Sequence, residues 1–104
     1  MARAVFNRVW NMQIELHVYE KEFVIGLLQK TTVQRVLDKL ESSSTPHPDN
    51  ADYIECELTI AELEDLVGEL SYEANHNRKK RVAAEACDIA EDLEHQLWSA
   101  KFAK

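Results

Sequence analysis

The chain has 104 residues, of which 45% are hydrophobic and 30% are charged. This length and composition predict one domain with its own core and exclude a wholly disordered chain. The net charge of -7 disfavours direct nucleic-acid binding, which needs clustered Lys and Arg. Because no run of 18 apolar residues and no secretory signal is visible, we expect a cytoplasmic protein without a membrane partner.

The N-terminal residues fit more than one structure. Residues 1–11 are compatible with a basic amphipathic helix, an additional strand or a non-native leader, because their hydrophobic residues follow neither period clearly. From Met12 to Val18 every second residue is hydrophobic, which is typical of a half-buried strand. We therefore predict an N-terminal extension over residues 1–11 and a single domain over residues 12–104.

A helical segment and a polar loop are expected next. Hydrophobic residues over 19–40 have mostly helical spacing, and the β-branched residues at Thr31 and Thr32 predict one helix that is broken near that point. The polar run that follows contains both prolines of the chain. It predicts an exposed loop over residues 42–52.

The second half of the chain predicts one strand and two helices. Residues 53–58 alternate as a strand, and Thr59 followed by Glu62 has the spacing of a capping box for a helix that begins at Ile60. A polar break at residues 75–77 predicts a turn, and a third helix is expected over 79–100.

These elements predict a small single α+β domain in the order β-α-β-α-α. We expect an antiparallel sheet packed against an α-helical hairpin. The sheet is either two-stranded or three-stranded, with the third strand supplied by the first twelve residues or by a second copy of the chain, because two strands alone are not stable in water.

Charge is segregated along the sequence. Residues 40–77 contain ten acidic residues and no Lys or Arg, and four consecutive basic residues follow. We interpret the acidic stretch as a docking surface for a basic protein, with ordinary solubilising charge as the alternative. The predicted protein-binding residues are Glu55, Glu57, Glu62, Asp65 and Glu69. The basic run is a weak candidate for anion binding, or simply complements a helix C-terminus, and consists of Arg78, Lys79, Lys80 and Arg81.

The sequence predicts no catalytic residue, no metal ligand and no cofactor. Cys56 and Cys87 stand apart from any second cysteine, so we expect reduced, buried thiols. His76 and His95 each follow a carboxylate by three residues, a spacing used in metal-binding helical bundles. A helical hairpin would hold the two histidines on the order of 25 Å apart, which is too far for one ion within one chain.

The C-terminal helix carries large hydrophobic residues near its end. A chain of this size has little core left to cover them, so a homodimer is expected. Its predicted interface residues are Leu97, Trp98 and Phe102. The leading hypothesis is a small acidic, non-enzymatic interaction protein of the adaptor, inhibitor or nucleic-acid-mimic type that binds a basic protein as a dimer. The alternative is a small-ligand or metal-dependent enzyme with its site at a subunit interface, using His76 and His95.

Overall fold

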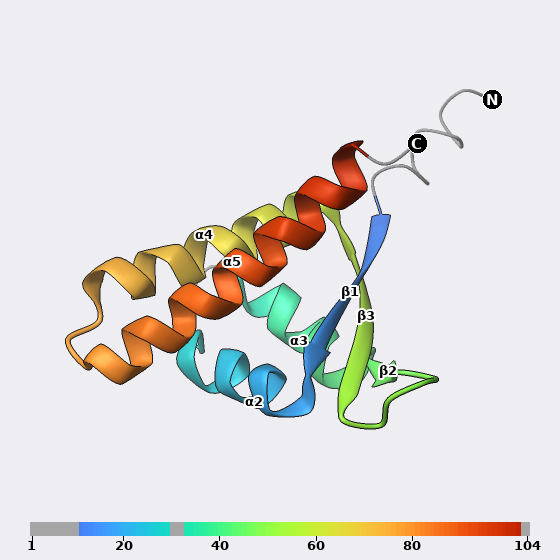
Figure 1. Cartoon of the computed structure of the whole chain (residues 1–104), viewed down its shortest axis with the longest axis horizontal. Coiled ribbons are helices and arrows are strands. Elements are labelled where there is room, and N and C mark those ends of the chain that lie inside the picture. Colours follow the sequence, from blue (N-terminus) through green and yellow to red (C-terminus); the bar gives the residue numbers. More distant parts are fainter. Residues whose placement is uncertain (1–10, 30–32, 103–104) are drawn as a thin grey trace.

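The computed structural model describes residues 11–29 and 33–102. Among these residues it forms a three-stranded antiparallel sheet with helices on one side (Figure 1). The elements in chain order are β1 (Asn11–His17), α2 (Val18–Leu27), α3 (Gln34–Ser42), β2 (Thr45–Pro46), β3 (Tyr53–Thr59), α4 (Ile60–His76) and α5 (Lys80–Phe102). The α+β class and the packing of the sheet against a helical hairpin, α4 and α5, are confirmed.

The alternation of the two long strands gives the sheet two different faces. β1 and β3 pair in a register that places Ile14 opposite Cys56 and Leu16 opposite Ile54. These four side chains are buried beneath the helices. Their polar neighbours point to the other side, because successive side chains of a strand alternate between faces. We call that side the outer face of the sheet.

The third strand has a different origin from the one predicted. It is β2, within the segment predicted as an exposed loop, and it pairs with β3 to give the strand order β1-β3-β2. The backbone N–H of His47 donates to the carbonyl oxygen of Tyr53 at 2.9 Å and extends this pairing. Pro46 lies in an edge strand, where its missing N–H has little effect on the sheet. Residues 1–10 lie outside the described residues, so the N-terminal extension stays a prediction.

The single broken helix expected over residues 19–40 is two helices, α2 and α3. α2 begins directly after β1, where His17 acts as the N-cap: its Nδ1 accepts from the N–H of Tyr19 at 3.1 Å. The predicted capping box of α4 is confirmed, since the Thr59 hydroxyl accepts from the N–H of Glu62 at 3.0 Å and the Glu62 carboxylate accepts from the N–H of Thr59 at 2.9 Å. Because the side chains of the N-cap residue Thr59 and of the third helical residue Glu62 are both hydrogen-bonded, α4 begins at a fixed residue.

The core lies between the sheet and the helices. α4 contributes Leu63, Leu66 and Leu70, and α5 contributes Ile89 and Leu93, all of them almost fully buried. Cys56 belongs to this core as predicted, and burial raises the pKa of its thiol. Cys87 is only half-buried, so the prediction of a buried thiol is wrong for that residue.

Candidate interaction surface on the outer face of the sheet

The outer face of the sheet is polar, and no helix of the described residues covers it. β1 contributes Gln13, Glu15 and His17, and β3 contributes Tyr53, Glu55 and Glu57. His47 lies beside them at the end of β2. The residues of β1, β2 and β3 include no Lys or Arg. This face therefore carries three carboxylates without a full positive charge from the strands themselves.

Two of the carboxylates directly oppose each other. The register pairs Glu15 with Glu55, and like charges at opposite positions of an antiparallel pair destabilise a sheet. Neighbouring donors reduce this repulsion. The Gln13 amide donates to Glu55 at 2.9 Å, and the Nε2 of His47 lies 3.3 Å from a Glu15 oxygen and 3.7 Å from a Glu55 oxygen.

The hydrogen bonds of His47 orient its ring. The backbone N–H of Asp49 donates to Nδ1 at 3.0 Å, which leaves Nε2 facing the two carboxylates. Glu15 and Glu55 together remain a site of double negative charge.

The same three residues have the composition of a metal site. Glu15, His47 and Glu55 place one ligand atom each within 4.8 Å of one another. A neutral ring that binds an ion through Nε2 carries its proton on Nδ1, at which the N–H of Asp49 points. The cluster is thus arranged for hydrogen bonding, and a metal would have to break the turn between His47 and Asp49.

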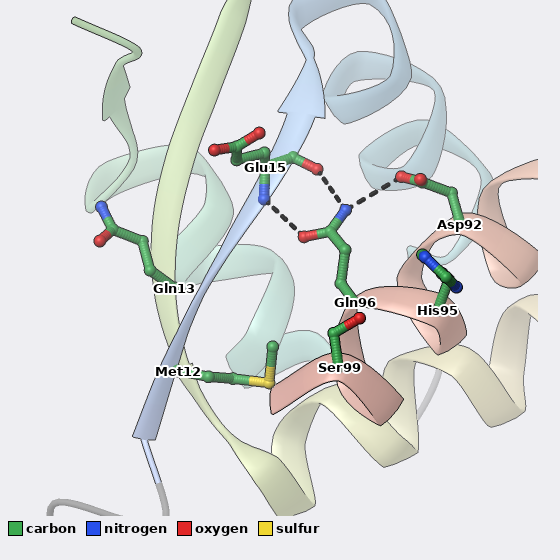
Figure 2. A pocket seen from close by; sticks show the side chains of 7 residues that line it. All are labelled: Met12, Gln13, Glu15, Asp92, His95, Gln96 and Ser99. Carbon is green, nitrogen blue, oxygen red and sulfur yellow. Dashed lines mark hydrogen bonds between the residues drawn. The ribbon is translucent and has the colours of Figure 1, made fainter. Parts of the chain in front are cut away.

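α5 closes part of the free edge of the sheet. The side-chain amide of Gln96 accepts from the backbone N–H of Glu15 at 3.0 Å and donates to the carbonyl of the same residue at 3.0 Å, as a neighbouring strand would (Figure 2). It also donates to Asp92 at 3.0 Å. An open groove of about 490 Å³ lies around this contact, lined by Met12, Gln13, Glu15, Asp92, His95, Gln96 and Ser99. Because an edge strand is a template for pairing, Gln96 protects β1 at this position.

The five acidic residues predicted as one docking surface are divided between different surfaces. Glu55 and Glu57 lie on the outer face, whereas Glu62 and Asp65 line a pocket beside Val36 of α3, on the buried side of the sheet. Glu62 forms an ion pair of 2.7 Å with Lys39 of α3. Partial burial opposes its ionisation, but the hydrogen bonds from Lys39 and from the Thr59 backbone outweigh this and lower the pKa of Glu62. The negative charge of Glu62 is therefore paired with Lys39 within the chain.

Glu69, the fifth predicted residue, is half-buried on α4 and already has an interaction within the chain. Sequence reasoning missed Glu15 and His47. The signal for Glu15 was the same alternation that placed Glu55 on the polar side of its own strand.

The basic run occupies the tip of the helical hairpin. Arg78 and Lys79 form the turn, while Lys80 and Arg81 begin α5. Lys80 and Arg81 follow the C-terminus of α4 and also lie at the positive N-terminal end of α5, whose first turn has no acidic residue. All four residues are exposed, and none takes part in the ion pairs found among the described residues. We call residues 78–81 the basic tip.

The residues predicted for a dimer interface have different environments. Leu97 is 6% exposed and packs in the chain's own core, so it offers no surface to a partner. Trp98 is 53% exposed. The side chain of Phe102 lies outside the part that the structure describes.

The two histidines of the predicted metal-site alternative lie on different helices. His76 lies at the end of α4, and His95 is 15 residues beyond Lys80 in α5, about 22 Å along the helix.

Comparisons with protein-family models, curated proteins and solved structures find no match to this chain. Within the described ranges, no helix has the length and apolar character needed to cross a membrane.

Proposed function

We propose that the chain is a non-enzymatic interaction protein that binds a basic protein surface through the outer face of its sheet. One observation carries this proposal: Glu15 and Glu55 oppose each other on a face to which the described strands contribute no Lys or Arg, with the His47 ring and the Gln13 amide as neighbouring donors. A cation from a partner would supply the missing charge, and Arg suits the position because its planar fork pairs with two carboxylate oxygens. Exposed Glu57 extends the surface along β3.

The geometry revises the surface that charge patterning predicts. Glu15 replaces the helical residues of the prediction, because it shares a face with Glu55 whereas Glu62 and Asp65 do not. Exposed carboxylates of this kind act mainly on the association rate and on partner selection. Because salt screens exposed charges, binding of the basic partner should depend strongly on salt concentration.

Titration with a fluorescein-labelled oligo-arginine peptide tests the proposal by fluorescence anisotropy. Binding at about 20 mM salt should weaken by an order of magnitude or more at about 300 mM salt, as expected for screened charges. The Glu15→Gln and Glu57→Gln double variant should lose roughly tenfold in affinity, corresponding to about 1.4 kcal/mol.

The matched control removes two exposed acids of α5, with Asp88→Asn and Glu94→Gln. It makes the same change in net charge but leaves the outer face intact. Equal weakening by both double variants would show that the peptide responds to net charge alone, and the proposal would then fail.

A further inference from the structure

We propose that this chain associates head to tail with copies of itself, the basic tip of one copy docking on the outer face of the sheet of the next. This inference rests on the proposed function and names the basic partner as the basic tip of a second copy. It follows from two charged surfaces of opposite sign that lie far apart on one molecule.

The cations of the basic tip form no ion pair with the described residues. Residues 74–84 contain four basic residues and no acid, and the first turn of α5 has no acid either. Arg78, Lys79, Lys80 and Arg81 are all exposed and lie outside the ion pairs of the described chain. An unneutralised cluster of this kind attracts anionic surfaces.

The two surfaces cannot neutralise each other within one copy. Figure 1 shows the α4–α5 turn at the left end of the molecule and the sheet at the right end, with the helices between them. Gln96 of α5 contacts the backbone of Glu15, and Arg81 lies 15 residues before it in the same helix, about 22 Å along the axis. That separation exceeds the Debye length of about 10 Å at 0.1 M salt. Neutralisation therefore requires a second molecule.

The placement also fits docking along the long axis. The basic tip is the end of a two-helix hairpin, and at the opposite end no helix of the described ranges covers the outer face of the sheet. Opposed carboxylates of Glu15 and Glu55, with Glu57 beside them, provide anionic partners for the guanidinium and ammonium groups of the tip. Because the two surfaces differ, the contact is heterologous, and repeated contacts give rings or open chains of copies instead of an isologous dimer.

Sedimentation velocity of the full chain tests this inference. We expect the average mass to increase with protein concentration at about 20 mM salt, and to rise no further than the mass of the predicted homodimer at about 300 mM salt. A tip variant (Arg78→Gln, Lys79→Gln, Lys80→Gln and Arg81→Gln) and a face variant (Glu15→Gln and Glu57→Gln) should each lose this salt-sensitive association.

Mixing the tip variant with the face variant is the decisive experiment. The tip variant keeps its outer face and the face variant keeps its basic tip, so the mixture should regain salt-sensitive association and stop at one contact between two molecules. The control variant Asp88→Asn with Glu94→Gln should associate like the unaltered chain. A mixture without salt-sensitive association, or a tip variant that keeps salt-sensitive association on its own, would overturn the inference.

Oligo-arginine titration separates this inference from the proposed function. Peptide binding to the outer face without self-association would refute head-to-tail docking and leave the proposed function standing. Neither peptide binding nor self-association would refute both. If the basic tip binds a single-stranded oligonucleotide while the chain stays unassociated, the tip has an external partner and the inference is wrong.

Discussion

Replacing His47 with alanine tests how the outer face tolerates two opposed carboxylates. The change removes the imidazole N–H that lies 3.3 Å from Glu15 and 3.7 Å from Glu55. It also removes the acceptor of the Asp49 N–H. A lost hydrogen bond costs about 0.5 to 1.5 kcal/mol, and an uncompensated like-charge pair costs about 0.2 to 1 kcal/mol. We therefore expect the free energy of unfolding to fall by about 1 to 2 kcal/mol.

Thermal unfolding measures the effect, since about 1 kcal/mol shifts the Tm of a domain of this size by roughly 4 to 8 °C. His47→Asn is the matched control, because an asparagine can still accept from the N–H of Asp49 but is too short to place a donor between the carboxylates. The His47→Asn variant should therefore be destabilised only by the repulsion between Glu15 and Glu55.

Adding Glu15→Gln to His47→Ala should restore part of the lost stability, because one of the two opposed charges is gone. The reasoning is refuted if Glu15→Gln gives no recovery in that background. It is also refuted if zinc raises the Tm of the unaltered chain through His47, since the Asp49 N–H that points at Nδ1 opposes a metal at Nε2.

Three further predictions concern the edge strand, the α4 cap and the dimer. Gln96→Ala should lower stability by about 1 to 2 kcal/mol in chemical denaturation, because both edge groups of Glu15 lose their partner, and an unchanged midpoint would contradict this. Because the pKa of Glu62 is lowered in the folded chain, its carboxylate contributes stability above about pH 4.5, and this stability is lost as pH falls through the lowered pKa. Glu62→Gln should therefore flatten this part of the dependence of the free energy of unfolding on pH. An unchanged dependence would refute the role of the ion pair with Lys39. At about 300 mM salt, where charge contacts are screened, the predicted homodimer should persist and Trp98→Ala should weaken it by about 2 kcal/mol in sedimentation equilibrium; a monomeric unaltered chain would show that no such dimer forms.

Local patterns account for the parts of the fold that were predicted correctly. The period-two alternation around Ile14 and Ile54 and the spacing of Thr59 and Glu62 each depend on neighbours within a few residues. These patterns predict the structure correctly because burial of one face of an element requires hydrophobic residues at the same spacing as in the sequence.

β2 could not be predicted in the same way. It has two residues, which is too short to show any period, and it depends on Glu55 and Ile54 across a turn. Pairing of this kind is decided by tertiary contacts, while the prolines and polar residues of the segment indicate a loop.

The candidate surface was predicted only in part for a related reason. Glu55 and Glu57 were identified from charge, but Glu15 joins them through strand register and His47 joins through the path of the segment after β2. The expectation that a single anionic face continues from strand to helix failed for Glu62. The polar side of β3 points away from the helices, and a residue of α4 cannot share it.

The most direct test of the central claim is a ¹⁵N–¹H correlation spectrum of the full chain during titration with oligo-arginine. We predict that the largest shift changes fall on the amides of Gln13, Glu15, Glu55 and Glu57 and on the ring signals of His47, with little change along α4. Changes that spread over all acidic surfaces in proportion to charge, or that concentrate on Asp65 and Glu69, would contradict a binding site on the outer face of the sheet.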